Sequence, residues 1–315
     1  MHWRLSTKTT GLLLALLSAL AFGGSGPFAR PLMDLGLTPL HVTWLRLCGM
    51  VLVLSPVAWH YRLVMVRQWR LMLAYGVFPI AGVQAFYFAS VARIPVGIAL
   101  LIEFLGPIFV LLWVVSVRKQ PVARTAVWGV LLAVVGLAAL LEVWQGIRLD
   151  VLGLMFALAA AACQAGYFLL SDAAQDDTPP LALIALGGTI AFILMTLIAQ
   201  PWSLPWSLLR NPISLAGTPA SAWVAVFWLG IVSTALAYVT GVAAIRRLSA
   251  PVAGGVAYLE VVTAILLAWV LLGQALNGVQ MLGASIVVLG AYLAQRSASH
   301  TVSAEIPAHE RETSS

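Results

Sequence analysis

The sequence predicts an all-α polytopic membrane protein with ten transmembrane helices, arranged as two inverted five-helix repeats around a central cavity. Two observations predict this fold class: long apolar stretches that recur along the chain, and an internal repeat. Of the 315 residues, 62% are hydrophobic and 9% are charged, whereas about a quarter of a soluble domain is charged. About 20 apolar residues span the hydrocarbon core of a bilayer as a helix. Such stretches are expected to be helical because lipid offers the backbone no hydrogen bonds.

Ten stretches of the chain fit this description. The predicted spans cover residues 10–29, 38–60, 70–92, 95–117, 124–144, 150–171, 180–200, 220–245, 250–273 and 277–296. Residues 201–219 contain four prolines and two tryptophans, which predicts an interfacial loop with Trp202 and Trp206 at the level of the lipid headgroups. Residues 297–315 are polar and predict a disordered cytoplasmic tail.

The first five spans resemble the last five in sequence. A shift of 154 residues superposes Gly76 on Gly230, Ala81 on Ala235, Arg93 on Arg247, Gly129 on Gly283 and Gly136 on Gly290. The sequence therefore predicts one repeat over residues 10–145 and a second over residues 150–296. Because five is an odd number, the second repeat must be inserted upside down, as in transporters that bind substrate near the membrane midplane. The alternative is a scaffold duplicated for stability alone.

Basic residues in the connections predict the orientation. With the N-terminus inside, twelve of the 17 Lys and Arg residues fall in inner segments and four in outer ones, while Arg46 lies within a span. Because an excess of basic residues marks cytoplasmic loops, both termini are expected in the cytoplasm and the protein in the cell inner membrane. Connection 171–179 is the exception, with three Asp and no basic residue, but acidic residues contribute little to this rule.

Several function classes find no support in the sequence. The net charge of +6 is spread over the cytoplasmic ends of the spans, so we expect no nucleic-acid partner. The stretch 23–27 matches the GxSG pattern of intramembrane serine proteases, but the five histidines lie at span ends or in tails, where none can serve as a buried base. We expect this stretch to end the first span and loosen it. No HExxH, Walker-type or CxxC motif is present, so we expect neither an enzyme nor a cofactor or metal.

Two carboxylates are predicted at membrane depth, Glu103 in the fourth span and Glu260 in the ninth. An unpaired charge in hydrocarbon is costly, so each should face a cavity or a partner. They lie about one turn apart on nearly the same face of repeat-equivalent helices. In a common cavity they could bind a cationic amine or exchange a proton with it. The structural alternative is a pair with Arg46 or with a tyrosine hydroxyl.

Other residues extend this candidate site. Pro107 cannot donate a hydrogen bond to the carbonyl of Glu103, which frees that oxygen at the level of the acid. Arg46 either snorkels to the outer surface or holds a substrate carboxylate with two hydrogen bonds. Polar and aromatic residues of the third, sixth and eighth spans are further candidates: Gln84, Tyr87, Gln164, Tyr167, Ser233, Thr234 and Tyr238. Interhelical hydrogen bonds are the alternative role for each of them.

The chain also resembles a known family in its motifs and their order. In the first half these are AFGGSGPFAR at 21, TWLRL at 43 and PVGIALLIEFLGPIFVLL at 95. The second half adds ACQAGYFLLSD at 162, STALAYVTGVAAIRRLSAP at 233 and LGQALNGVQMLGASIVVLGAYL at 272. Over residues 10–296 the pattern resembles the drug/metabolite transporter superfamily, in particular its EamA-domain members and their threonine/homoserine exporter branch. One departure is Gln274 after Gly273, where the family often has Glu.

The resemblance implies a secondary transporter that exports small metabolites, with amino acids or related amines as the favoured substrates. Because the chain holds no ATP-binding motif, we expect a gradient, most simply of protons, to drive transport by alternating access. The expected partners are a small-molecule substrate, the lipid bilayer and protons, for a monomer or homodimer. The alternatives are a uniporter or importer of sugars or nucleotide-sugars, and a membrane sensor or scaffold protein.

Overall fold

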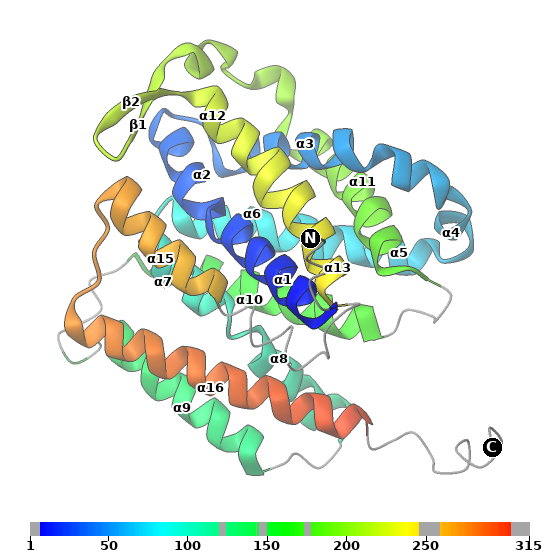
Figure 1. The fold of residues 1–315 in the computed structure, drawn as a ribbon, viewed down its shortest axis with the longest axis vertical. Coiled ribbons are helices and arrows are strands. Elements are labelled where there is room, and N and C mark those ends of the chain that lie inside the picture. The colour runs from blue at the N-terminus through cyan, green and yellow to red at the C-terminus, as the bar shows by residue number, and fades with distance from the viewer. Residues whose placement is uncertain are drawn as a thin grey trace, which may run out of the picture.

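The computed structural model describes residues 7–119, 124–142, 144, 150–172, 178–245 and 259–303, and most of these residues are helical (Figure 1). The first half consists of α1 (Thr7–Gly23), α2 (Ser25–Asp34), α3 (Pro39–His60), α4 (Arg62–Arg67), α5 (Trp69–Tyr75), η1 (Gly76–Gly82), α6 (Val83–Val91), α7 (Val96–Glu103), α8 (Gly106–Trp113), η2 (Val114–Arg118) and α9 (Arg124–Leu140).

The second half begins with two long helices and a connection that contains two short strands. Its elements are α10 (Val151–Asp172), α11 (Pro180–Ala199), η4 (Pro201–Ser203), η5 (Trp206–Arg210), β1 (Pro212–Leu215), β2 (Thr218–Ser221), α12 (Ala222–Phe227), η6 (Trp228–Leu236), α13 (Ala237–Ile245), α15 (Leu259–Leu272) and α16 (Gly278–Ser303).

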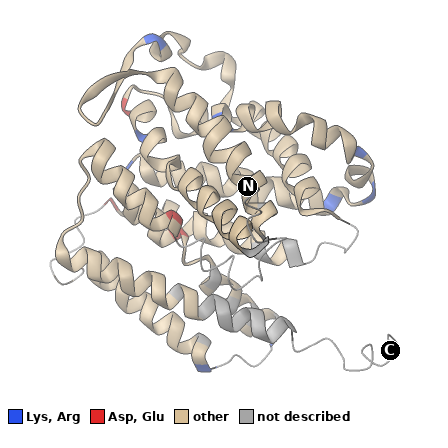
Figure 2. Cartoon of the chain, viewed as in Figure 1, with Lys and Arg blue, Asp and Glu red and all other residues tan. Residues whose placement is uncertain are grey.

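Six helices in the described part of the chain are long and apolar enough to cross a membrane. Shorter apolar helices lie in the other predicted spans: Val127–Leu140, Val151–Tyr167, Leu259–Leu272 and Gly278–Gly290. Large apolar side chains such as Leu52, Trp128 and Leu266 are exposed, and charged residues are few along the ribbon (Figure 2). Extensive exposed apolar surface marks a face that meets an apolar partner or a membrane. The protein is therefore a polytopic helical membrane protein, and the number of ten crossings stays a prediction.

Polar contacts join connections that were predicted on the same side of the membrane. Arg93 follows the third predicted span and pairs at 3.1 Å with Asp150, the first residue of the sixth, just before α10. The N–H of Gly153 and the Arg93 side chain both lower the pKa of the Asp150 carboxyl below its usual value. On the opposite predicted side, Gln68 Nε2 donates to Thr178 Oγ1 at 2.7 Å. Both contacts agree with a chain that alternates between the two sides.

The two halves make corresponding helix contacts. α1 packs against α13 as α10 packs against α6, and α3 packs against η6 as α11 packs against η1. Likewise α1 contacts α15, and α10 contacts α7. α9 packs against α16, and this pair lies apart from most of the other helices in Figure 1. The interior is therefore built jointly by both halves and does not consist of two separate bundles.

Glycines at repeat-related positions let these helices approach closely. Gly230 of η6 lies against Gly49 of α3, where a Cβ on Gly230 would be 2.9 Å from the Gly49 Cα. Gly76 of η1 lies against α11, where its Cβ would be 2.7 Å from the Gly187 carbonyl oxygen. Small residues allow such close packing between membrane helices. η1 and η6 are both π-helical, and π-helical turns occur frequently at functional sites.

The first predicted span takes a different course from the one expected. The glycine-rich stretch 23–27 does not end this span, as was predicted; it interrupts the helix at Gly24, and α2 then continues to Asp34. Close packing explains these glycines, because a Cβ on Gly24 would overlap Trp228 and one on Gly26 would overlap Tyr87. The stretch is thus the place where the first span crosses helices of both halves.

Residues 212–221 form a β-hairpin that the sequence did not predict. Its turn residues Ala216 and Gly217 have φ angles of +53° and +74°, and two consecutive positive φ angles are typical of tight two-residue hairpins. The N–H of Ala216 donates to the Leu271 carbonyl at 2.9 Å, so the hairpin tip is fixed to the end of α15. Pro212 and Pro219 explain why the sequence did not predict the hairpin, because proline disfavours strands.

The tryptophans before this hairpin lie at the surface, whereas the last helix is longer than predicted. Trp202 and Trp206, predicted at headgroup level, are both exposed. α16 continues to Ser303, beyond residue 296 where the last span was predicted to end. No Gly or Pro interrupts residues 291–303, so the polar start of the predicted tail can prolong the helix. Residues 304–315 lie outside the described part.

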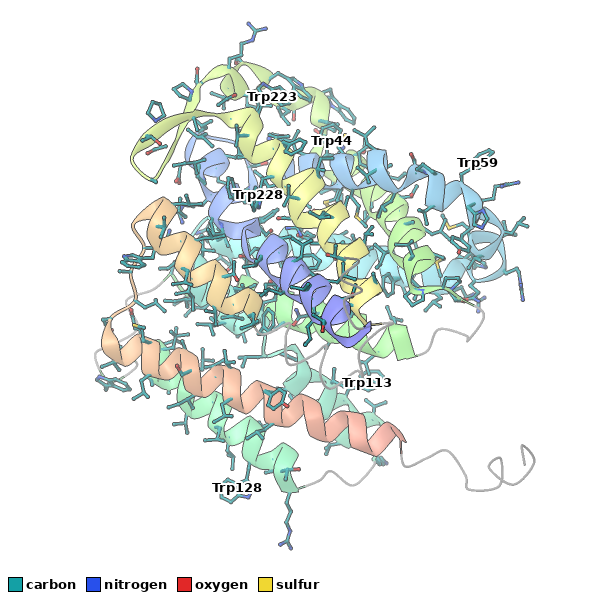
Figure 3. The ribbon with its side chains drawn as sticks, viewed as in Figure 1. Trp44, Trp59, Trp113, Trp128, Trp223 and Trp228 are labelled. Carbon is teal, nitrogen blue, oxygen red and sulfur yellow. The ribbon has the colours of Figure 1, made fainter. Side chains whose placement is uncertain are left out.

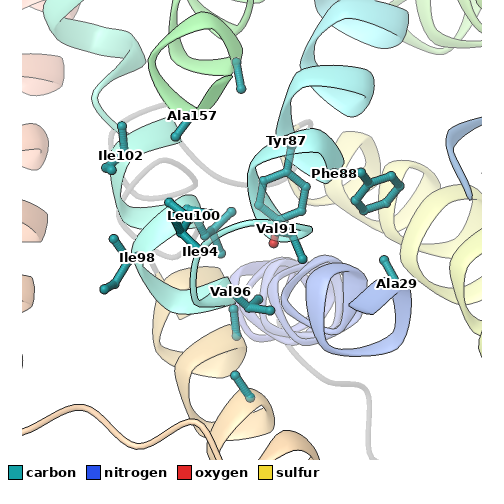
Figure 4. Close-up of a cluster of buried hydrophobic side chains, with 14 of the residues drawn as sticks. Ala29, Tyr87, Phe88, Val91, Ile94, Val96, Ile98, Leu100, Ile102 and Ala157 are labelled. Carbon is teal, nitrogen blue, oxygen red and sulfur yellow. The ribbon is translucent and has the colours of Figure 1, made fainter. Parts of the chain in front are cut away.

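A buried apolar cluster fixes the turn between α6 and α7. Figure 4 shows Tyr87 and Phe88 of α6 and Val96 and Ile98 of α7 packed near α2 and α10. Phe88 and Val96 are fully buried. Because the start of α7 is held in this cluster, Glu103 at its end has a defined position in the interior.

The α9–α16 contact leads to a stability prediction. A Cβ on Gly283 would overlap the Leu140 backbone and lie 2.8 Å from the Gly136 carbonyl oxygen. Gly283→Ala should therefore lower the stability by about 1–3 kcal/mol through overpacking, seen as a lower melting temperature in detergent. Gly278→Ala is the matched control, because nothing lies within 4 Å of its Cβ position. Equal melting temperatures for the two variants would contradict the close contact.

Candidate functional site

Three ionisable side chains lie within electrostatic range of one another inside the helical core. Arg46 of α3 is 2% exposed and Glu103 at the end of α7 is 7% exposed, and Glu260 of α15 is partly buried. Arg46 interacts electrostatically with both acids and with the hydroxyls of Tyr87 and Tyr238. These five residues, three from the first half and two from the second, are called the charge cluster below.

The Arg46 guanidinium connects several helices. It donates to Ser25 Oγ at the start of α2 and, at 3.0 Å, to the Ser233 carbonyl oxygen in η6. Its Cζ lies 5.7 Å from the centre of the Phe88 ring. Of the two positions considered for this arginine, outer surface or interior, the structure has the interior one.

Glu103 lies at a break between two helices. α7 ends at Glu103 and α8 begins at Gly106, as expected if Pro107 cannot donate to the Glu103 carbonyl. Gln164 Nε2 of α10 donates to Glu103 Oε1 at 3.4 Å, a long hydrogen bond. A Cβ on Gly106 would lie 2.6 Å from Gln164 Oε1, so this glycine leaves room for the amide. The Pro107 side chain lies outside the described part.

Glu260 brings the second half to the cluster. It follows Leu259, the first residue of α15, and residues 250–258 of the predicted ninth span lie outside the described part. The Glu260 carbonyl oxygen would be 2.8 Å from a Cβ on Gly23. α15 therefore approaches the end of α1 backbone to backbone at the level of this acid.

The polar residues predicted on the third, sixth and eighth spans are not equally close to the acids. Gln84 and Tyr87 are both buried on α6. Tyr238 packs edge-on against Phe22 at 4.9 Å between ring centres. Tyr167 interacts electrostatically with Tyr238, and its ring lies 5.9 Å from that of Tyr75. Tyr167 is thus placed beside the cluster and not within it.

A separate cavity of about 660 Å³ lies at the end of α15 near the hairpin. Arg30 and Asp34 of α2, paired at 2.9 Å, contribute to its lining, as do residues of β1 and of the end of α15. Gln274 also lines it. The Gln274 Oε1 accepts the N–H of Val96 at 3.0 Å, so this amide ties the end of α15 to the first residue of α7.

Ser25 and Trp228 are neighbours of the cluster that the sequence did not single out. Ser25 was considered only as the serine of the GxSG pattern, and its role as an acceptor for Arg46 depends on the packing of α2 against α3. Trp228 stacks on Phe28 at 4.5 Å between ring centres. Ser233 was named only among residues that could line the cavity. The composition of each span gives no signal for these contacts, because they join α2, α3 and η6.

Comparisons with known proteins agree with this architecture. The EamA-like transporter family matches residues 9–141 and 151–295. The threonine/homoserine exporter RhtA of Escherichia coli (strain K12) is 31% identical over 281 residues, which cover 88% of this chain and 88% of that protein. The uncharacterized transporter YwfM of Bacillus subtilis (strain 168) is 29% identical over 285 residues, covering 88% and 91%. A solved crystal structure with 21% identity has a TM-score of 0.62, covers 93% of this chain and 99% of its own, and shows likeness of fold.

Proposed function

The chain belongs to the EamA-like transporter family, and on that premise we propose that it exports small amino acids or related amines by proton-coupled alternating access. Membership makes the chain a membrane transporter and not an enzyme, and its named relatives include an exporter. The substrate class, the coupling ion and the direction in this chain are our proposals.

The charge cluster is the observation that carries this proposal. Arg46 and Glu103 are buried, although a charge in an apolar interior is costly unless it has a partner or a function. A zwitterionic amino acid presents both an ammonium and a carboxylate. It can therefore interact with the acids and the guanidinium at once, which a solute without charged groups cannot do.

The competing functions fit this cluster less well. A sugar carrier needs hydroxyl and amide groups but no charged partner, so it does not call for two acids near an arginine in the interior. A sensor or scaffold protein needs no charge inside the bilayer. The name of the relative at 31% identity refers to threonine and homoserine, which favours small polar amino acids as the substrates of this chain as well.

The cluster also suggests how protons could drive export. With Arg46 and both acids charged, it carries a net charge of −1, which an apolar interior disfavours. One proton on Glu260 would offset this charge. A zwitterionic substrate adds one positive and one negative charge and leaves the net charge unchanged, so the simplest coupling is an alternation in which the site holds either the proton on Glu260 or the substrate ammonium on Glu103. The corresponding contacts of η1 with α11 and of η6 with α3 provide two similar places where the halves could move against each other.

We further propose that the chain lies in the cell inner membrane with both termini in the cytoplasm. The excess of Lys and Arg in the predicted inner connections supports this orientation. A reporter that is active only in the cytoplasm should be active when it is fused after residue 315. A reporter that is active only in the periplasm should be active when it is fused near residue 210. A periplasmic C-terminus would contradict the orientation and the inverted repeat together.

The function is tested with Glu103→Gln, which keeps the size of the side chain but removes its charge. Cells are loaded with dipeptides, and the efflux of free amino acids identifies the substrate of the unaltered protein. The variant should transport that substrate at least about tenfold more slowly, because a hydrogen bond to a charged group is lost. The measurement is efflux at equal expression, from pH 6 to pH 8.

Glu142→Gln is the matched control, since Glu142 lies outside the cluster and accepts from Asn277 at an exposed site. It should transport at the normal rate. If Glu103→Gln also transports normally across this pH range, Glu103 has a structural role and the proposed site is wrong. If the unaltered protein exports no amino acid, the substrate class is wrong.

A further inference from the structure

Three buried donors near the break between α1 and α2 are left without a partner. Arg46 Nε, Ser233 Oγ and Trp228 Nε1 are inaccessible to solvent and have no hydrogen-bond partner among the described residues. Arg46 and Ser233 are almost fully buried as whole residues. An unsatisfied buried polar group costs about 1–3 kcal/mol, so three in one region indicate that something else binds there.

These donors lie on segments that contact one another. Arg46 donates to Ser25 on one side and to the Ser233 carbonyl on the other. The Trp228 indole nitrogen lies against Gly24, the residue before Ser25. Residues 228 and 233 are five apart in η6, which is the hydrogen-bond spacing of a π-helix, so they share one face of it. Figure 3 shows Trp228 between η6 and the first span.

The three donors differ in type but can bind the same kind of ligand group. The indole nitrogen and the guanidinium can only donate hydrogen bonds, and the planar guanidinium matches the geometry of a carboxylate. The hydroxyl of Ser233 can turn to donate as well. The ring of Trp228 is held in place by its stack on Phe28, with 13° between the ring planes. A ligand group that only accepts hydrogen bonds and carries negative charge fits this set.

We infer that Arg46, Ser233 and Trp228 form the subsite for the carboxylate of the transported molecule. This inference rests on the proposed function and gives the substrate a direction within it: the carboxylate lies toward η6 and α2, and the ammonium lies toward Glu103. The required substrate feature is therefore a free carboxylate. Amines without a carboxylate gain no binding energy from these three donors.

The test compares an acid with its amide in purified protein reconstituted into vesicles. The probes are threonine and threoninamide, each competing against radiolabelled threonine exchange. Trp228→Phe removes the indole N–H and keeps an aromatic ring on Phe28. The concentration of threonine needed for half-inhibition should rise about tenfold in this variant, while that of threoninamide should stay unchanged. Ser233→Ala should likewise raise the half-inhibition concentration of threonine and leave that of threoninamide unchanged. It serves as the second variant if Trp228→Phe does not fold.

Trp223→Phe is the matched control, because Trp223 lies on the adjacent α12 and is 51% exposed. It should change neither value. Equal shifts for threonine and threoninamide, or no shift in either variant, would overturn the carboxylate subsite while leaving amino-acid export intact. If the unaltered protein exchanges neither threonine nor any other amino acid, the proposed function itself fails.

Discussion

The Arg46 guanidinium must be satisfied in the interior of a protein whose outer surface faces lipid, where an isolated charge is unfavourable by several kcal/mol. Its contacts with Ser25, Ser233 and Phe88 fix the mutual positions of α2, η6 and α6 around α3. The two acids stand within electrostatic reach of the same group. Because the cluster draws on both halves, a ligand that changes its charge balance acts on the contacts that hold the halves together.

Small residues make this arrangement possible. In lipid, apolar burial does not drive helices together, so they associate through close packing and hydrogen bonds. Glycines allow close contacts between helices: Gly49 lies against Gly230, Gly76 against Gly187, and Gly24 against Trp228. The first two crossings involve η1 and η6, which lie at repeat-related positions. The third crossing, at Gly24, places the break of the first span beside the guanidinium.

The sequence alone predicts the class of fold well, because apolar length and the 154-residue repeat are properties of the chain itself. It also identifies Arg46, Glu103 and Glu260, since a charge within an apolar stretch is conspicuous. It does not predict the hairpin at residues 212–221, where prolines conceal the strands, or the continuation of the first span beyond Gly24. Ser25 and Trp228 are missed for a different reason, because their significance comes from contacts between separate helices. Ser25 accepts from Arg46, 21 residues along the chain, and Trp228 lies against Gly24 of the first span.

The central claim is that the charge cluster binds substrate and couples it to protons, with separate tasks for its two acids. Glu103 has the Gln164 amide beside it and a carbonyl to which Pro107 cannot donate, which suits an ammonium, and Glu260 is the candidate to carry the proton. The most direct measurement is threonine accumulation in reconstituted vesicles after a pH step, made with Glu260→Gln. The account predicts that this variant binds threonine with nearly normal affinity but no longer concentrates it when the pH gradient is applied. Undiminished accumulation by Glu260→Gln would contradict it.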